Sequence, residues 1–385
     1  MNKQKTLGLY LHIPFCRQKC VYCDFYSLAG NESRMDEYTD ALCAHLEQWA
    51  PRVENHTVDT VYFGGGTPSY LGEERLRRIM DTVLRRYSVC ETAEITLEAN
   101  PDSAGDPAVL RRLRNAGFNR ISLGMQSACS EELAEIGRIH TPEQVQTAVS
   151  AARSAGFDNL SLDLIYGLPR QTMEHWATNL SAAVTLAPEH LSCYGLKVEE
   201  GTPLFARRET AGLPDDEAQA DMYLYTVEFL RNAGYDQYEI SNFSRPGRES
   251  RHNLKYWTLG EYLGFGPGAH SDFGGVRFAY NRDLSAYLQG VRACVPALSE
   301  QEELSASDRM SEWLMLGLRT VQGLDPAAYE ANFHSPFSVF LPFLNQCRKA
   351  GYAVLEQACW HLTPQGFLLS NQIIGRLLDL AAASE

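Results

Sequence analysis

The first two-thirds of the chain repeat one unit, a short apolar segment followed by a segment of helical length. Six apolar segments are predicted strands: 7–14, 58–65, 94–100, 120–127, 159–167 and 190–199. The segments between them are predicted helices, several of which begin or end at proline or glycine: 34–50, 73–87, 107–116, 142–155, 173–186 and 215–232. Strands that alternate with helices pair in parallel through right-handed crossovers. Because six units are fewer than a closed barrel needs, the sequence predicts an α/β fold with an open, partial (β/α)6 barrel. A doubly wound open sheet is the alternative.

Polar and apolar side chains alternate along three of these strands. The apolar faces are expected to pack on helices, and the polar faces to line the barrel interior: Glu94, Thr96, Glu98 and Asn100; Ser122, Gly124 and Gln126; Ser161 and Asp163. Buried carboxylates and amides are costly unless a ligand or a partner satisfies them. Ligands of parallel α/β folds gather at the carboxyl ends of strands, where Glu98 and Gln126 lie. The pattern therefore predicts an internal ligand site, with a self-paired polar core as the alternative.

The charge balance and the hydropathy pattern narrow the class of protein. The 385 residues include 34 Lys+Arg and 48 Asp+Glu, a formal net charge of −14. An acidic chain is repelled by phosphate, so we expect no nucleic-acid partner. No apolar run approaches the length of a membrane span, and the N-terminal stretch is too poor in apolar residues for a signal peptide. We therefore expect a cytoplasmic protein that does not span a membrane.

The pattern changes after about residue 235. Residues 235–243 are predicted to form one more strand, and a glycine-rich stretch covers 260–275. Charged sequence at 299–308 is typical of a loop at a domain boundary, and two amphipathic helices are predicted beyond it, at 307–320 and 339–350. The last segment has the pattern strand, turn, strand, helix, which predicts a C-terminal α+β winged-helix-like domain with a packing or partner role. The predicted domains are a core barrel at 1–235, a connecting region at 236–300 and the C-terminal domain at 301–385.

Three of the ten cysteines form a cluster in the sequence. Cys16, Cys20 and Cys23 have the spacing C-x3-C-x2-C directly after the first strand. Zinc prefers four ligands in two pairs, and no second pair is evident. Three thiolates on one loop suit an iron–sulfur cluster with one iron left open. S-adenosylmethionine can chelate such an iron through its amino and carboxylate groups, whereas three unrelated buried cysteines are the plain alternative.

A glycine-rich segment follows the second strand. GGGTP (64–68) would let the backbone approach a ligand and present its N–H groups to a carboxylate. Such a segment is also a common turn. At the same end of the barrel as the cysteines, it fits the amino-acid moiety of S-adenosylmethionine.

These segments together resemble a known family. HIPFCRQKCVYC (12–23) is similar to the radical S-adenosylmethionine signature, and five further segments resemble the anaerobic coproporphyrinogen oxidase branch of that superfamily: GGGTP, LEANP (97–101), SLGMQS (122–127), GRIH (137–140) and LDLIYGLP (162–169). The resemblance implies that Cys16, Cys20 and Cys23 hold a [4Fe–4S] cluster. It also implies a set of S-adenosylmethionine contacts, in which Asp163 would accept from ribose hydroxyls and Arg138 would pair with a carboxylate: Tyr10, Tyr22, Gly66, Thr67, Glu98, Gln126, Arg138 and Asp163.

Two departures from the oxidase pattern place the chain in another branch. The oxidase has a fourth cysteine two residues after the third, where this chain has Phe25, and it has a long arm before the cluster loop. The short N-terminal segment, Phe25 and the motif HNLKYW (252–257) resemble the haem-chaperone branch, of HemW type. The resemblance then implies haem binding and delivery of haem to acceptor haemoproteins such as respiratory enzymes at the membrane. Coproporphyrinogen oxidation and another radical reaction, such as methylation, are the alternatives.

The HNLKYW motif also has a physical interpretation as a haem site. His252 offers an imidazole ligand for iron, and Tyr256 and Trp257 offer flat aromatic surface for a porphyrin. Asn253 belongs to the same motif, and nearby Lys255, Arg248 and Arg251 would bind propionates. A histidine among aromatic residues is more often a packed residue, so the resemblance carries this assignment.

Overall fold

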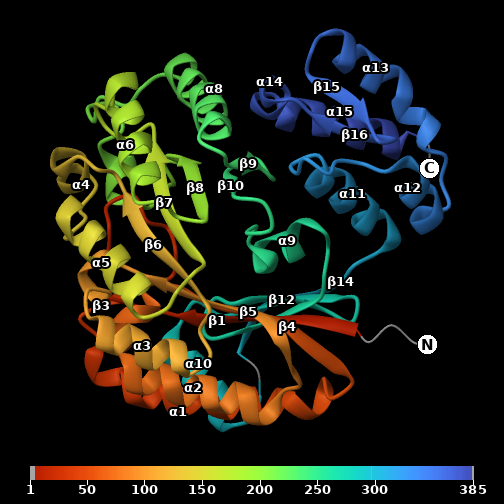
Figure 1. The fold of residues 1–385 in the computed structure, drawn as a ribbon. Helices are drawn as coiled ribbons and strands as arrows, with labels where there is room; N and C mark the ends of the chain where they lie inside the picture. The colour runs from red at the N-terminus through yellow and green to blue at the C-terminus, as the bar shows by residue number, and fades with distance from the viewer. Residues whose placement is uncertain (1–4, 296, 384–385) are drawn as a thin grey trace.

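A computed structural model describes residues 5–295 and 297–383 of the chain. Its main feature is one mixed sheet of twelve strands, curved around an interior and covered on the outside by helices (Figure 1). Six parallel strands form the centre of the sheet and lie side by side in chain order: β1 (Lys5–Ile13), β4 (His56–Gly65), β5 (Val89–Ala99), β6 (Arg120–Gln126), β7 (Leu160–Tyr166) and β8 (His190–Gly195). This run has no reversal of order of the kind that defines a doubly wound sheet. The partial barrel predicted from the sequence is confirmed.

The predicted helices form between the strands, with ends close to those expected: α1 (Met35–Trp49), α2 (Glu73–Arg86), α3 (Pro107–Asn115), α5 (Pro142–Ser154), α6 (Met173–Thr185) and α8 (Asp216–Asn232). Local signals fix several of the starts. The Asp106 carboxylate accepts from the first backbone N–H groups of α3, and Thr141 and Gln144 form a capping box on α5. Two short helices were not predicted, α4 (Ser130–Glu135) and α7 (Pro203–Ala206). Both follow strand ends and border the interior.

Alternation along β1 shows how the core is built. Leu7, Leu9 and Leu11 are fully buried under the helices, whereas Tyr10 and His12 face the other way, into the barrel. The same division holds along the neighbouring strands, so one continuous apolar core lies between sheet and helices. The inner face is left to polar side chains.

The segment from 236 to 303 extends the sheet at both edges. The predicted single strand at 235–243 is instead two short antiparallel strands, β9 (Asp236–Gln237) and β10 (Asn242–Ser244). The chain reverses between them because the buried Glu239 carboxylate accepts from the backbone N–H of Ser241 and from Asn242.

At the other edge, β11 (Tyr262–Phe265) pairs in parallel with β1, and three antiparallel strands follow: β12 (His270–Phe273), β13 (Val276–Tyr280) and β14 (Leu298–Glu303). The loop predicted at 299–308 is therefore wrong for its first half. Charged residues are tolerated in β14 because it is an exposed edge strand.

The C-terminal part contains the predicted helices and a small β-wing. The predicted helices are α11 (Ala306–Gly317), α13 (Leu341–Lys349) and α15 (Ser370–Ala382), and two further helices, α12 (Pro326–Phe333) and α14 (Pro364–Leu368), were not predicted. The wing is an antiparallel pair, β15 (Ala353–Glu356) and β16 (Cys359–Leu362), which matches the predicted order of strand, turn, strand and helix. Among the described residues, no helix combines the length and apolar content needed to cross a bilayer.

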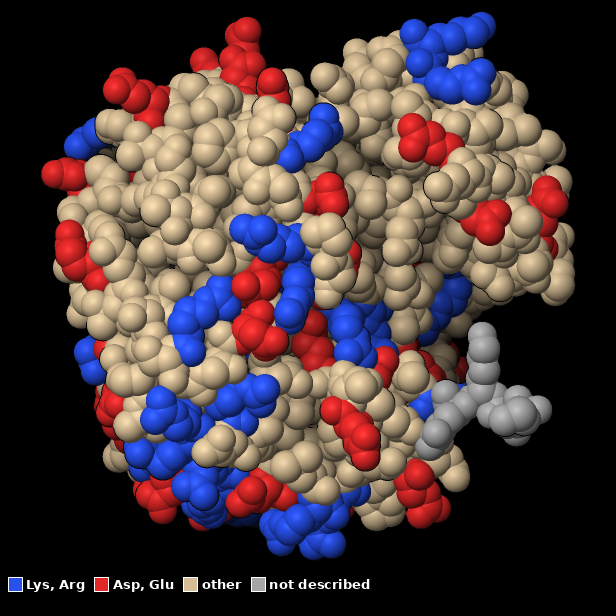
Figure 2. Space-filling view, in the orientation of Figure 1, with Lys and Arg blue, Asp and Glu red and all other residues tan. Residues whose placement is uncertain are grey.

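Acidic and basic side chains are mixed over the face of the molecule in Figure 2. The arginines of α2 and α3 are largely paired with carboxylates of α1 and α2: Arg75 with Asp36, Arg78 with Asp40, Arg86 with Glu47 and Arg112 with Glu73. Exposed pairs of this kind contribute little to stability. These carboxylates offset the positive charge of the arginines on α2 and α3.

Candidate functional site

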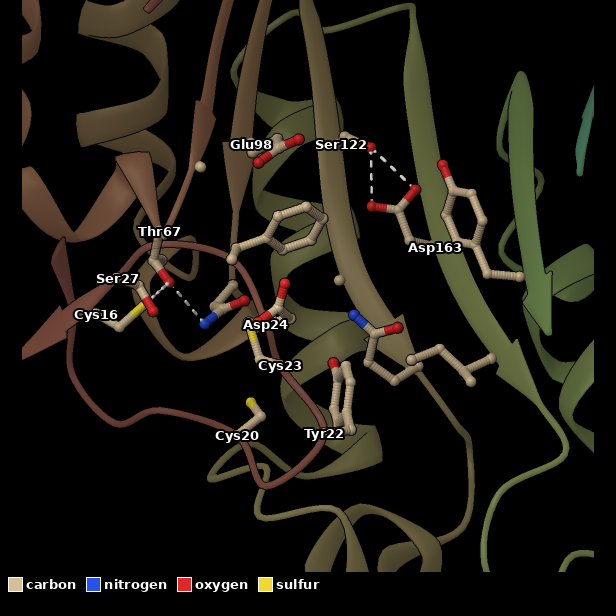
Figure 3. Close-up of a pocket in the computed structure, with 18 of the residues that line it drawn as sticks. Cys16, Cys20, Tyr22, Cys23, Asp24, Ser27, Thr67, Glu98, Ser122 and Asp163 are labelled. Carbon is tan, nitrogen blue, oxygen red and sulfur yellow. Dashed lines mark hydrogen bonds between the residues drawn. The ribbon is translucent and has the colours of Figure 1, made fainter. Parts of the chain in front are cut away.

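A cavity of about 500 Å³ lies inside the barrel, between the cysteine loop and the inner faces of β4 to β8 (Figure 3). Most of the residues singled out from the sequence line it: Cys16, Cys20, Tyr22, Cys23, Gly66, Thr67, Glu98, Gln126, Arg138, Asp163 and Asn253. Four others lie outside its wall: Tyr10, His252, Tyr256 and Trp257. The predicted polar faces therefore meet at one internal site.

The cysteine loop is anchored by backbone contacts at its base and at its tip. At the base, Cys16 belongs to β2 (Phe15–Cys16), which pairs with β3 (Leu28–Ala29). At the tip, the Val21 N–H donates to the carbonyl of Ile136, and the Val21 carbonyl accepts from the N–H of Leu204. All ten cysteines are free thiols. The structure thus holds three thiols on a loop that is fixed by the protein chain itself.

The GGGTP segment is hydrogen-bonded to the chain at the start of this loop. The backbone N–H groups of Gly66 and Thr67 donate to the carbonyls of Ile13 and Phe15, each at 2.8 Å. The prediction that these groups face a ligand carboxylate is therefore not met in this structure. A Cβ at Gly66 would lie 2.8 Å from the Phe15 carbonyl oxygen, which explains the need for glycine. The segment fixes the position of the loop.

Arg138 connects the loop to the strands. Its guanidinium donates to the carbonyl of Gly124 at 2.8 Å and to Asn100 Oδ1 at 2.7 Å, and it lies 3.7 Å from Cys20 Sγ. Gln126, at the end of β6, has a φ of 61°, a left-handed conformation that is strained in a residue other than glycine. Such strain is typical of functional sites.

The acidic side of the cavity is formed by Glu98 and Asp163. Tyr62 donates to Glu98 Oε1 at 2.6 Å, and Ser122 Oγ lies 3.1 Å from each oxygen of Asp163. Burial raises the pKa of both carboxyls, to about 7 for Glu98, and the negative charge of Asp163 raises the pKa of Glu98 further. This side of the cavity therefore favours a ligand that carries positive charge.

Arg120 is a site residue that the sequence analysis missed. It begins β6, is almost completely buried and lines the cavity, yet its Nε has no hydrogen-bond partner among the described residues. Its position on the same face as Ser122 and Gln126 was the available signal. Its positive charge lowers the pKa of Glu98 and of Asp163, although burial of the two carboxyls has the larger effect.

The floor of the barrel is a short helix, α9 (Arg251–Trp257), which carries the HNLKYW motif. The Glu94 carboxylate accepts from the backbone N–H groups of Arg251 and His252 at the first turn of α9. Lys255 is buried and bonded to Asp59 on β4. Carboxylates on β4 and β5 thus hold α9 inside the barrel. These contacts satisfy part of the polar interior without a ligand.

His252 is enclosed in this floor. Its Nδ1 lies 2.8 Å from Thr60 Oγ1 and its Nε2 lies 2.7 Å from the Tyr256 hydroxyl, while its ring stacks on Tyr62. Burial lowers the pKa of His252 to about 3, so the ring is neutral at pH 7. Both nitrogens are occupied, so ligation of haem iron by His252 requires that α9 first be displaced. The predicted propionate partners are also engaged, since Lys255 binds Asp59 and Arg251 binds backbone carbonyls.

We expect His252→Ala to lower the free energy of unfolding by about 2–3 kcal/mol, because two buried hydroxyls lose their partner and a small void remains. Denaturant unfolding at pH 7 measures this effect. His270→Ala is a control, since that ring is half exposed and pairs with the exposed Glu300. Equal stability of the two variants would show that the contacts of His252 contribute nothing.

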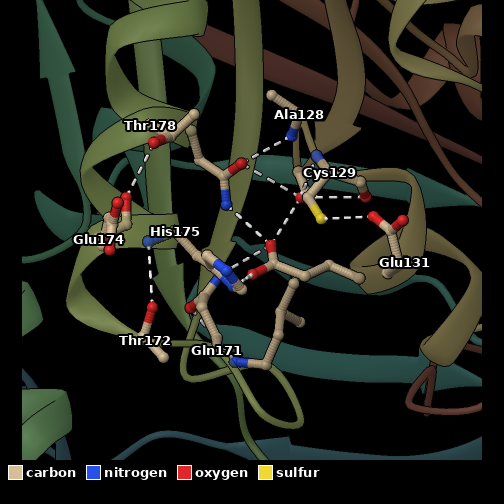
Figure 4. A network of polar contacts seen from close by, with 12 residues as sticks. Ala128, Cys129, Glu131, Gln171, Thr172, Glu174, His175 and Thr178 are labelled. Atoms are coloured by element: carbon tan, nitrogen blue, oxygen red, sulfur yellow. Dashed lines mark hydrogen bonds and ion pairs between the residues drawn. The ribbon is translucent and has the colours of Figure 1, made fainter.

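A second polar network lies behind the turn that follows β6 (Figure 4). The buried Glu132 of α4 accepts through Oε2 from Ser127, Gln171 and Asn179, at 2.6, 3.1 and 2.9 Å. Asn179 Oδ1 in turn accepts from the backbone N–H of Ala128. The network therefore fixes the chain directly after Gln126. The sequence analysis did not identify Glu132, because the short helix that carries it was not predicted.

The chain is similar to known proteins over most of its length. Residues 10–182 match the model of the radical SAM superfamily, and residues 304–369 match the HemN C-terminal domain. The Heme chaperone HemW of Bacillus subtilis (strain 168) is 35% identical, with 96% of this chain and 98% of that protein covered. The Heme chaperone HemW of Escherichia coli (strain K12) is 36% identical, with 97% and 98% covered. Among solved structures, coproporphyrinogen III oxidase (HemN) from Escherichia coli superposes with a TM-score of 0.84 at 27% identity, over 97% of this chain and 90% of that chain.

Proposed function

The chain belongs to the HemW family of the radical SAM superfamily, and on this premise we propose that it is a haem chaperone, which binds haem and transfers it to acceptor haemoproteins. The observation that carries the proposal is the similarity to named haem chaperones from end to end, at 35% and 36% identity. Overall shape alone does not decide the function, because an oxidase shares the fold.

Cys16, Cys20 and Cys23 are proposed to hold a [4Fe–4S] cluster. Within residues 5–295 and 297–383, no three histidine, cysteine or carboxylate side chains converge on a position for a single metal ion. The loop thus offers separate thiols, which suits a cluster whose irons each take one thiolate. A bound cluster would supply an open iron for S-adenosylmethionine and an electron for reductive chemistry.

S-adenosylmethionine is proposed to occupy the cavity between this loop and the strands. Glu98 and Asp163 would face its positive charge and hydroxyls, Tyr22 its adenine, and Gln126 its polar edge. Tyr10 is the one proposed contact that lies behind the cavity wall, where its hydroxyl bonds to His12 Nδ1 at 3.0 Å. Its effect on the ligand would be indirect.

Coproporphyrinogen oxidation is the second candidate, favoured by the similarity to the oxidase structure. Against it stands Phe25, which replaces the fourth cysteine of the oxidase pattern with an apolar side chain. A phenyl ring can neither ligate iron nor transfer a proton. This difference supports a chaperone in preference to an oxidase.

The test of the proposed function is anaerobic reconstitution of the cluster followed by two parallel assays. In the first, haem is titrated into the holo-protein, and the bound haem is then offered to an apo-haemoprotein acceptor. In the second, coproporphyrinogen III is supplied with S-adenosylmethionine and a reductant. We expect haem binding and transfer without formation of protoporphyrinogen. Turnover without haem binding would overturn the proposal.

The pKa of Glu98 predicts how S-adenosylmethionine binding depends on pH. Burial holds this pKa near 7, so in the ligand-free protein the carboxyl is largely protonated at pH 6 and ionised at pH 8. The sulfonium cation favours the carboxylate, so below pH 7 binding must displace a proton. We expect affinity to rise about tenfold more between pH 6 and pH 8 in the wild type than in Glu98→Gln.

The comparison with Glu98→Gln isolates this group from others that titrate or carry charge around it, namely Tyr62, Asp163, Arg120 and Tyr10. Equilibrium dialysis with labelled S-adenosylmethionine at constant ionic strength gives both profiles. Parallel profiles for the two proteins would rule out proton displacement at Glu98.

A further inference from the structure

Part of the cavity wall consists of residues that have no proposed contact with S-adenosylmethionine. These residues come from the cysteine loop, from the segment after β8 and from the turn before α10 (Leu284–Arg292), and they include both apolar and basic side chains: Lys19, Phe25, Tyr194, Leu196, Lys197 and Arg282. These three segments are far apart in sequence. The fold brings all three to the lining of the same cavity.

Phe25 is the main apolar group of this wall. Its side chain is 68% exposed, more than any other large apolar residue described, although it lies only two residues after the partly buried Cys23. Tyr194, at 41% exposed, lines the same cavity. Large exposed aromatic rings in a concave site are typical of a surface that a flat ligand covers.

Three cations line the same cavity as these rings. The Lys19 ammonium donates to the Phe25 carbonyl at 3.3 Å, Arg282 lies 3.9 Å from Asp24, and Lys197 pairs with Glu199 at 2.6 Å. These pairs are exposed to solvent, and such pairs are weak. Ligand carboxylates can therefore replace Asp24 and Glu199 as partners of the cations. The wall combines flat apolar surface with binding groups for acids.

We propose that this wall is the haem site: the macrocycle lies against the ring of Phe25, and its propionates bind Lys19, Lys197 and Arg282. The inference rests on the proposed chaperone function, and it assigns haem to a wall of the internal cavity and not to the HNLKYW motif of α9. His252 is sealed in the barrel floor with both ring nitrogens occupied, whereas Phe25 is accessible as it stands.

The same geometry predicts how tightly haem is held. No histidine lines this cavity among the described residues. Stacking and ionic contacts then provide most of the affinity. A cargo site without a strong iron ligand releases haem readily, as transfer to an acceptor requires.

The experiment is a haem titration of reconstituted holo-protein, with variants compared at matched cluster content. We expect Phe25→Ser to raise the haem Kd about tenfold, as loss of one aromatic stacking contact does. Phe25→Trp should bind at least as tightly as the wild type. Charge reversal of the three cations together (Lys19→Glu, Lys197→Glu and Arg282→Glu) should raise the Kd by a similar or larger factor. Leu84→Ala and Lys349→Glu, exposed apolar and basic positions on other faces, should leave it unchanged.

The outcomes separate this inference from the proposed function. Absence of haem binding by the wild type would overturn both. Haem binding that is lost in His252→Ala but unchanged in Phe25→Ser and in the charge-reversal variant would overturn the site and leave the chaperone function. Should Phe25→Ser fail to retain its cluster, the charge-reversal variant decides between the two sites, because Lys197 and Arg282 are exposed and lie outside the cysteine loop. Haem-dependent protection of 17–26 and 194–199 from deuterium exchange, without protection of 251–257, would support the site.

Discussion

Replacement of Cys20 by serine is expected to abolish the iron–sulfur cluster. The cysteine loop provides three thiols, and in a [4Fe–4S] cluster each thiolate binds a different iron. A serine hydroxyl is not deprotonated near neutral pH, so one iron would lose its protein ligand. Cys20→Ser also removes the thiol nearest to the Arg138 guanidinium, at 3.7 Å. We expect the same loss in Cys16→Ser and in Cys23→Ser.

Iron and sulfide analysis and the visible absorption of reconstituted protein measure this loss. Cys90→Ser and Cys347→Ser are matched controls, because Cys90 is at the start of β5 and Cys347 is in α13, away from the cavity. Both controls should reconstitute fully. Full cluster content in Cys20→Ser would remove the basis for placing a cluster on this loop.

The order and the ends of the elements were predictable where local signals are strong. Pro107 and Pro142 start helices, and polar caps precede them, so both helix starts agree with the sequence prediction. Alternation along β5, β6 and β7 predicted the polar lining of the cavity, since strand geometry alone decides which face a side chain takes. Glu98, Gln126 and Asp163 were identified in this way.

The features that were missed depend on contacts between distant segments. Nothing local in HNLKYW indicates that Glu94, about 160 residues earlier, caps its helix inside the barrel. The motif therefore looked like an accessible haem site when its histidine is a buried part of the floor. The glycines of GGGTP likewise fit either a ligand or a neighbouring loop, and only the hydrogen bonds to Ile13 and Phe15 distinguish the two.

Short elements account for the remaining differences. The segment of β9 and β10 was predicted as one strand because aromatic and β-branched residues recur along it, and the buried Glu239 that reverses the chain is unremarkable in sequence. β14 was predicted as a loop because it is acidic, a composition that only an edge strand tolerates. In each case the partner strand, which the sequence does not reveal, decides the structure.

Glu132→Leu is expected to have the largest effect on stability among single substitutions outside the cysteine loop. Glu132 is almost completely buried, and its Oε2 accepts from the side chains of Ser127, Gln171 and Asn179. Leucine fills a similar volume but leaves these donors without their acceptor. We expect the free energy of unfolding to fall by about 3–5 kcal/mol, as for other broken buried polar networks.

The same substitution should weaken S-adenosylmethionine binding, because the network fixes the turn after β6. Ser127 and Ala128 are bonded into it directly behind Gln126, whose backbone is held at a φ of 61°. Released from the network, Gln126 would relax to an ordinary conformation and leave the cavity wall. The free energy of this backbone strain corresponds to a roughly tenfold rise in the Kd for S-adenosylmethionine.

Two control variants, Glu131→Leu and Glu132→Gln, test whether the effects on stability and on binding both come from the buried carboxylate. Glu131→Leu lies on the same short helix, but Glu131 is exposed and its side chain accepts from Cys129 Sγ, so stability should change by less than about 0.5 kcal/mol. Glu132→Gln keeps an oxygen that can accept from the same donors, so it should fall between Glu131→Leu and Glu132→Leu. Denaturant midpoints and equilibrium dialysis provide the two measurements. A Glu132→Leu protein with normal stability and normal affinity would show that the turn is held by the strand alone, and that the strained backbone of Gln126 does not depend on the carboxylate behind it.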